Sequence, residues 1–449
     1  MLKRKIDSFL ENFYNTTSKA LLITGARQVG KSYSIREFGK RFTSFVEINF
    51  VDTPEAIQIF RTAQNSREIL ERLSVMQGVR LVKGQTLIFF DEVQLCPEIV
   101  TAIKFLVDEG SYRYILSGSL LGVALRDLRS EPVGYMGVKE MYPLDFEEFI
   151  QALGIAESVI NSIRHAWETK TPVDAFVHSK MLELFRLYLV VGGMPAAVQQ
   201  YIETRNLALV LEMQQDIIHL YKRDIAQYAP HRKLNICEIF DLIPPELNAA
   251  NKRFILKSLN KNAKLERYED DFLWLKNAGV ALAVYNVEEP KIPLLLARSR
   301  NLFKLFQNDV GLLACQYAAE GLQLKVLMGD KNINFGSVYE NAVAQELTAH
   351  GLHPYYYNSK KRGELDFVVE LNGVVLPIEV KSGKDFARHR ALANIMECED
   401  YILPEALVLC NDNMKTVGNI TYAPVYMVMF LQPRNDVPSH YEVDISMLS

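Results

Sequence analysis

A glycine-rich segment between a predicted strand and a predicted helix constrains the fold of this chain most. Gly25–Ser32 matches the pattern GxxxxGK[ST] in full; the apolar run Leu21–Thr24 precedes it and the helical pattern Ser32–Phe38 follows. In this context the backbone N–H groups curl around phosphate oxygens, and the helix N-terminus adds a favourable partial charge. Lys31 then reaches the β- and γ-phosphates, while the Ser32 hydroxyl completes a Mg²⁺ shell. The segment, here named the phosphate-binding loop, predicts a site for a nucleoside triphosphate. Its expected contact residues are Gly25, Ala26, Arg27, Gln28, Val29, Gly30, Lys31, Ser32 and Tyr33.

Two acids at the end of a later apolar run supply the second half of such a site. The run Leu87–Phe90 is followed by Asp91 and Glu92. Asp91 is expected to hold Mg²⁺ through water, and Glu92 to polarise the attacking water. Ser117 follows the next predicted strand, and two interpretations stay open for it: a sensor of the γ-phosphate, or a plain turn serine. We expect ATP as the nucleotide; no guanine-specific motif is visible, and GTP stays open as the alternative.

Short apolar strands alternate with helical segments through the first 150 residues, which predicts a parallel sheet of an α/β fold. The chain then becomes helical from about Phe146 to about Tyr228. With 449 residues, it is long enough for about two to four domains.

Composition excludes several classes of protein. The net charge of -4 gives no overall attraction to nucleic acid, so any such affinity must be local. The five cysteines are odd in number and lack CxxC spacing, which argues against disulfide frameworks and structural zinc and fits a reducing cytoplasm. No apolar run has the length of a membrane span, so we expect a cytoplasmic protein without membrane contact.

A predicted β-hairpin near the C-terminus gathers acidic residues. Asn372-Gly373 lies between two alternating apolar runs, which is a strong hairpin signal. If Leu371 pairs with Val374, Asp366 falls opposite Glu379 on one face. Two carboxylates in that relation repel each other, so the pattern predicts a cation between them, with Mg²⁺ or Mn²⁺ favoured by the oxygen ligands.

Two further residues join this predicted acidic cluster. Lys381 lies two residues after Glu379, on the same face of its strand. Glu340 has capping-box spacing from Ser337, yet it also lies on the apolar stripe of its helix, so cap and metal support remain open alternatives. The metal ligands predicted from the sequence are Ser32, Asp91, Glu340, Asp366 and Glu379.

Metal-dependent phosphodiester cleavage would use these groups: carboxylates hold the metal, the metal lowers the pKa of a water, and Lys381 assists the nucleophile. The alternative is a solvated, charged hairpin. Basic residues that flank the cluster, and are suited to a nucleic-acid backbone, are Lys360, Lys361, Arg362, Lys384, Arg388 and Arg390.

A basic stretch precedes this region. Asn251–Arg267 contains six basic residues and one acid, and is followed by a predicted helix, Tyr268–Asn277, and a predicted strand, Val280–Val287. Helices followed by a strand pair suggest a winged helix with its basic side over DNA phosphates. An ordinary solvated helix face is the alternative.

With these residues in view, the chain resembles a family of bacterial and archaeal ATPases that have an AAA-type P-loop domain followed by a C-terminal domain of unknown function. The resemblance covers roughly residues 19–430. Besides the phosphate-binding loop and the acidic hairpin, its motifs are Phe89–Gln94, Leu116–Ser119, Tyr142–Phe149, Val191–Pro195, Lys222–Ile225 and Phe303–Leu312. The C-terminal part looks like a restriction-endonuclease-like fold of the PD-(D/E)xK type, in which Glu340, Asp366, Glu379 and Lys381 match motif positions, and Leu365 replaces the proline.

The resemblance implies four regions: a P-loop NTPase sheet (1–150), a helical lid (151–228), a winged-helix-like region (229–301) and a small α/β nuclease-like domain (302–449). In a ring or oligomer, an arginine from one subunit completes the neighbour's site; Arg126 and Arg129 are candidates, or plain exposed arginines. Many relatives carry a basic residue where this chain has Tyr135, which cannot serve as such an arginine.

Two functions follow as expectations. The first is a Mg²⁺-dependent ATPase, catalysed by Lys31 and Glu92, coupled to a C-terminal domain that binds or cleaves DNA through Glu379 and Lys381. The second is an ATP-dependent switch or scaffold whose C-terminal domain binds a partner without cleavage. Either function is compatible with a homo-oligomer or a partner protein.

Overall fold

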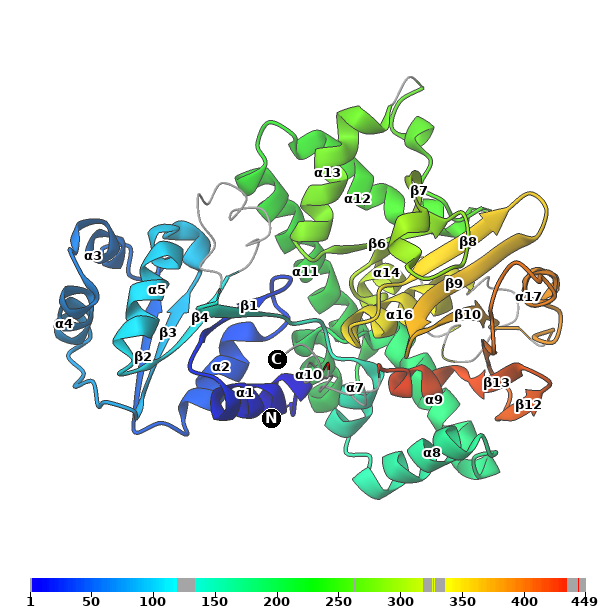
Figure 1. Cartoon of the computed structure of the whole chain (residues 1–449), viewed down its shortest axis with the longest axis horizontal. Coiled ribbons are helices and arrows are strands. Elements are labelled where there is room, and N and C mark those ends of the chain that lie inside the picture. Colours follow the sequence, from blue (N-terminus) through cyan, green and yellow to red (C-terminus); the bar gives the residue numbers. More distant parts are fainter. Residues whose placement is uncertain are drawn as a thin grey trace.

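Two β-sheets with helices between them make up the chain (Figure 1). The computed structural model describes residues 2–118, 134–249, 251–261, 264–317, 325, 327, 336–383, 385–433 and 443. The predicted residues Arg126, Arg129 and Lys384 lie outside this described part.

The N-terminal sheet has five parallel strands in the order β2-β3-β4-β1-β5, which confirms the predicted parallel α/β sheet. Since parallel strands end at one edge, the residues that follow β1, β3 and β4 meet there. The strands are β1 (Ala20–Thr24), β2 (Ser44–Asn49), β3 (Thr86–Asp91), β4 (Arg113–Ser117) and β5 (Met136–Glu140). The helices are α1 (Lys5–Thr16), α2 (Lys31–Gly39), α3 (Ala56–Thr62), α4 (Ser66–Gln77) and α5 (Glu98–Glu109), with the 3-10 turn η1 (Val93–Leu95).

Five helices follow the first sheet, which confirms the helical region predicted from Phe146 to Tyr228. They are α7 (Phe146–Ala152), α8 (Glu157–Thr169), α9 (Ala175–Val191), α10 (Pro195–Thr204) and α11 (Leu207–Tyr228). Within the described residues, no single helix is long and apolar enough to cross a membrane; α9 and α10, bent by 120°, pass such a test only as a pair, by length and composition.

The second sheet has eight strands in the order β12-β13-β11-β10-β9-β8-β6-β7. Its strands are β6 (Ala281–Val287), β7 (Arg298–Gln307), β8 (Tyr355–Ser359), β9 (Gly363–Leu371), β10 (Val374–Val380), β11 (Ala406–Cys410), β12 (Lys415–Val417) and β13 (Ile420–Pro424). The helices of this part are α12 (Lys233–Asn248), α13 (Leu265–Asn277), α14 (Val310–Gln316), α16 (Gly336–Ala349) and α17 (Arg390–Met396), with the 3-10 turns η3 (Leu256–Ser258), η4 (Leu294–Ala297) and η5 (Val425–Phe430).

The predicted strand pair after the basic stretch belongs to this second sheet. β6 and β7 pair antiparallel, and β6 also pairs in parallel with β8. The expected boundary between residues 301 and 302 therefore falls within β7. The winged-helix assignment stays a prediction.

The predicted hairpin register is confirmed. Leu371 pairs with Val374, and the antiparallel pairing continues outward to Phe367 and Ile378. Asn372 and Gly373 both have positive φ, 51° and 82°, as a two-residue turn of this kind requires. The next residues outward are Asp366 and Glu379, so the hairpin places both acids at the same level of the sheet.

Candidate functional site

The phosphate-binding loop is a tight turn that closes on Lys31. Gly25 and Gly30 have φ values of 128° and 95°, which side chains disfavour. A Cβ on Gly25 would lie 2.1 Å from the carbonyl oxygen of Met141, so no larger residue fits. The Lys31 ammonium donates hydrogen bonds to the carbonyl oxygens of Gly25 (2.9 Å) and Ala26 (2.8 Å). The loop therefore carries its own cation at its centre.

Asp91 lies between two serine hydroxyls. Ser32 Oγ donates to Asp91 Oδ2 at 2.7 Å, and Ser117 Oγ donates to Asp91 Oδ1 at 2.5 Å. The three side chains come from the start of α2 and the ends of β3 and β4. A hydroxyl and a carboxylate that converge in this way are oxygen donors of the kind Mg²⁺ prefers, so these residues fit the metal of a nucleotide complex.

Glu92 has a left-handed backbone at φ 56°, uncommon for a residue with a side chain. Gln94 Nε2 donates to its carboxylate at 2.5 Å. Strained backbone of this kind often accompanies functional sites. Glu92 and Asp91 also face Lys31: burial lowers the pKa of the Lys31 ammonium to about 8, while the two carboxylates raise it.

A cavity of about 690 Å³ opens in front of the loop. Its walls include the loop, the two acids, the N-terminal segment and the start of α10, and are formed by Leu2, Arg4, Arg27, Gln28, Gly30, Lys31, Ser32, Tyr33, Ser34, Arg36, Asn49, Asp91, Glu92, Pro195, Ala196 and Gln199. Ala26, Val29 and Ser117 are buried, and the Ser117 hydroxyl donates to Asp91. Arg27 Nη1 contacts Asp224 of α11 at 2.6 Å, which attaches the loop to the helical region.

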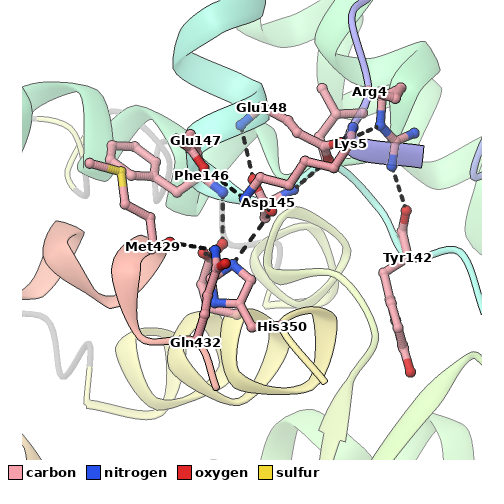
Figure 2. Close-up of polar contacts among 12 residues, drawn as sticks. Arg4, Lys5, Tyr142, Asp145, Phe146, Glu147, Glu148, His350, Met429 and Gln432 are labelled. Carbon is pink, nitrogen blue, oxygen red and sulfur yellow. Dashed lines mark hydrogen bonds and ion pairs between the residues drawn. The ribbon is translucent and has the colours of Figure 1, made fainter. Parts of the chain in front are cut away.

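A buried ionic network lies behind the loop (Figure 2). Arg4 contacts Glu148, whose carboxylate accepts a hydrogen bond from the backbone N–H of Asp145. The Asp145 carboxylate lies 2.7 Å from Lys5 Nζ and 3.5 Å from His350 Nε2. Burial raises the pKa of Asp145, but Lys5 and His350 lower it further, so its net shift is downward. The network joins the N-terminal ends of α1 and α7 to the C-terminal end of α16.

The predicted acidic cluster is brought together, but with lysines among the acids. Glu340, 2% exposed, contacts Lys252, and its Oε2 lies 3.7 Å from Lys304 Nζ. Lys381 Nζ lies 2.8 Å from Glu379 Oε2. Asp366 Oδ2 accepts a hydrogen bond from the backbone of Val380 at 2.9 Å. The Glu340 side chain thus points into the cluster. The sequence leaves a helix cap and metal support open for this residue.

The arrangement of this cluster does not fit a bound metal as it stands. Within the described residues, no group of three or more His, Cys, Asp or Glu side chains is placed to hold a metal ion. Three ammonium groups contact the carboxylates instead. Burial and the nearby Asp366 raise the pKa of Glu379 to about 8, while Lys381 lowers it.

The basic residues flanking the cluster divide by exposure. Lys360, Lys361, Arg388 and Arg390 are exposed, whereas Arg362 is half-buried against Tyr401. The earlier basic stretch contains η3 and only the first turn of α13. Its exposed basic residues are Lys257, Lys261, Lys264 and Arg267.

Sequence analysis did not place several contact residues in these sites, among them Arg4, Asp224 and Lys304. Arg4 lies in the cavity wall, Asp224 pairs with Arg27, and Lys304, fully buried, sits among the acids. Only Lys304 carried a signal, because a lysine inside the apolar run Phe303–Phe306 needs a buried partner.

Comparison with known families gives a match for the part of the chain that contains the phosphate-binding loop. Residues 17–150 match a family described as an AAA domain. The N-terminal sheet is therefore similar to an AAA domain. Residues 182–323 and 335–427 match two domains of unknown function, DUF8612 and DUF4143. The phosphate-binding loop, Asp91 and Ser117 lie within the residues that match the AAA domain, whereas Glu340, Asp366, Glu379 and Lys381 lie within the second domain of unknown function.

Two similar solved structures have low sequence identity to this chain. A search of curated proteins found no match. Among solved structures, a Walker-type ATPase of Pyrococcus abyssi is 16% identical, with 71% of this chain and 96% of that chain covered and a TM-score of 0.42. The Orc1 protein of Aeropyrum pernix, solved in complex with DNA, is 13% identical over 70% of this chain and 87% of that chain, with a TM-score of 0.26.

Proposed function

We propose that this chain binds ATP and hydrolyses it with Mg²⁺. The observation that carries the proposal is the convergence of Lys31, Ser32 and Asp91 at one edge of the sheet, in front of a cavity of about 690 Å³. A triphosphate needs an ammonium, backbone N–H groups and oxygen ligands for its metal, and this edge supplies all of them.

Each residue then has a role. Lys31, now bonded to two loop carbonyls, turns its ammonium to the β- and γ-phosphates. Ser32 and Asp91 would hold Mg²⁺, which supplies positive charge to the phosphate oxygens when bound. Ser117 keeps the Asp91 carboxylate oriented through its hydrogen bond. Glu92 orients the attacking water and accepts its proton.

The test is ATP hydrolysis by wild type and by Lys31→Ala, with Lys40→Ala as the matched control because Lys40 is an exposed lysine of the same region. We expect Lys31→Ala to lose at least about 100-fold in turnover, since it removes a charge from the developing transition state. Lys40→Ala should retain wild-type turnover. Equal turnover in all three proteins refutes the proposal.

For the part of the chain after about residue 250, two candidate functions remain. The first is a nuclease-like domain acting on DNA through Asp366, Glu379 and Lys381, whose acids would have to leave their lysine partners to hold a metal. The ammonium groups of Lys252 and Lys304 on Glu340 favour the other candidate, a binding domain without cleavage that responds to the nucleotide. In both, the exposed basic residues between 257 and 267 are the proposed contact with a DNA backbone.

A plasmid-nicking assay separates the two candidates. Wild type and Asp366→Ala are compared with Mg²⁺ or Mn²⁺, with and without ATP. Cleavage that is lost in Asp366→Ala supports the nuclease. DNA retention by wild type in a gel-shift assay, with no cleavage under any of these conditions, supports the binding domain.

A further inference from the structure

Arg4 lies against the phosphate-binding loop although it comes from the N-terminal segment. It is 7% exposed, and each of its three guanidinium nitrogens has an acceptor. Nη1 donates to the carbonyl oxygen of Val29 at 2.9 Å, Nη2 to that of Tyr142 at 2.8 Å, and Nε to Glu148 Oε1 at 3.1 Å. A planar guanidinium with three fixed acceptors has one orientation, so it acts as a rigid anchor.

The contact with Val29 determines the direction of a neighbouring N–H group. In a planar trans peptide, the carbonyl oxygen and the following N–H point in opposite directions. Ile292–Pro293 is the cis bond of the described chain, so the Val29–Gly30 peptide is trans. Holding Val29 O toward Arg4 therefore aims the N–H of Gly30 away from Arg4. Backbone N–H groups of this loop are the ones that cradle the phosphates.

The Arg4 anchor is itself connected to α16, a helix that contacts the second sheet. Glu148, which holds Arg4, forms a capping box with Asp145 at the start of α7. Glu346 of α16 accepts a hydrogen bond from the backbone N–H of Phe146 at the same helix end, at 2.7 Å. Figure 2 shows this network running from Arg4 past Asp145 to His350. The position of the loop is thus tied to α16, whose other end carries Glu340.

We propose that Arg4 is a positioning residue for the phosphate-binding loop, which orients the Gly30 N–H for the nucleotide phosphates. This inference rests on the proposed nucleotide site. It assigns Arg4 no contact with the reacting atoms; its effect passes through the Val29–Gly30 peptide.

The experiment measures ADP affinity by calorimetry and the KM and kcat of ATP hydrolysis. Arg4→Gln, Arg4→Lys and wild type are compared, with Arg67→Gln as the control because Arg67 is an exposed arginine whose ion pair with Glu71 lies on the surface. We expect Arg4→Gln to weaken ADP binding about ten-fold and to raise KM in proportion, as loss of a hydrogen bond from a charged donor predicts. Arg4→Lys retains the positive charge but not the planar guanidinium that reaches three separate acceptors, so it should fall between Arg4→Gln and wild type.

A merely structural role gives a different pattern. It lowers the active fraction, so kcat falls while KM and the Kd for ADP stay unchanged, and that result overturns the inference. If Arg4→Gln does not fold, Glu148→Gln weakens the hold on Arg4 while leaving the loop sequence intact, and must raise the Kd for ADP. Wild type that neither binds ADP nor hydrolyses ATP overturns the proposed function itself.

Discussion

Ser32 and Asp91 are 59 positions apart in the chain, yet Ser32 Oγ lies 2.7 Å from Asp91 Oδ2. Ser32 lies in the first turn of α2, which follows β1, and Asp91 ends β3. β1 and β3 are not neighbours in the sheet, because β4 lies between them. Ser117 at the end of β4 contacts the other oxygen of the same carboxylate. The start of α2 and the end of β4 thus hold the acid at the end of β3, in the wall of the cavity.

Ser117→Ala tests whether that second contact matters. The substitution removes one of two hydroxyl donors and leaves the Asp91 carboxylate with the hydrogen bonds from Ser32 and from the Glu92 backbone N–H. We expect ATP hydrolysis to fall about ten-fold, because a hydrogen bond to a charged group contributes about 1.5 to 3 kcal/mol. Ser111→Ala is the control, since Ser111 contacts the exposed Glu109. Unchanged turnover in Ser117→Ala would assign Ser117 to the turn alone.

The lowered pKa of Lys31 predicts a pH dependence of nucleotide binding. Burial brings this pKa to about 8 in the free protein, so Lys31 loses its proton above that pH. Bound phosphates favour the charged ammonium and raise the pKa again. ADP affinity should therefore be level below about pH 8 and decline above it, with up to about one proton taken up on binding at pH 9.

Calorimetry at pH 9 in two buffers of different ionisation enthalpy measures this proton uptake directly. In Lys31→Met the uptake should vanish together with the pH dependence. An ADP affinity that is constant from pH 7 to 9.5 in the wild type contradicts the assignment of Lys31.

Gly25→Ala should destabilise the part of the chain that contains the N-terminal sheet. The new Cβ would lie 2.1 Å from the backbone oxygen of Met141, at a φ of 128°. We expect a loss on the order of 2 to 4 kcal/mol in the free energy of unfolding, from steric overlap and backbone strain together. Gly78→Ala is the matched control: its φ is also positive, but nothing lies near its Cβ, so it should lose only about 1 kcal/mol. Equal losses in urea unfolding would contradict this.

Lys304→Met should lower the free energy of unfolding of the part of the chain that contains the second sheet. The Lys304 side chain is fully buried, and its ammonium lies 2.8 Å from Glu364 and 3.7 Å from Glu340. Removing one partner of a buried ion pair costs about 3 to 5 kcal/mol, because the remaining charge is left in a dry environment. Glu340→Gln added to Lys304→Met should restore part of the loss, as measured by a double-mutant cycle in urea. A loss below about 1 kcal/mol would show that water reaches the cluster.

Features that depend on consecutive residues could be predicted. The hairpin register follows from Asn372-Gly373 and the alternation on either side, because a two-residue turn leaves one way to pair the strands. The phosphate-binding loop could also be predicted from residues that are close together in the sequence. Its position between β1 and α2 followed from the apolar run before it and the helical pattern after it.

Contacts between distant segments could not be predicted. Arg4 and Glu148 are 144 positions apart, and nothing in either segment marks the other as its partner. Lys252 and Lys304 reach Glu340 only because β7, α16 and the segment after α12 pack together. The amino-acid order alone determined the local loop, the hairpin and the parallel strands, since backbone geometry and side-chain periodicity act over a few residues. Only the tertiary structure decided which charges neutralise the buried acids, because a charge removed from water takes whichever partner the packing brings within reach.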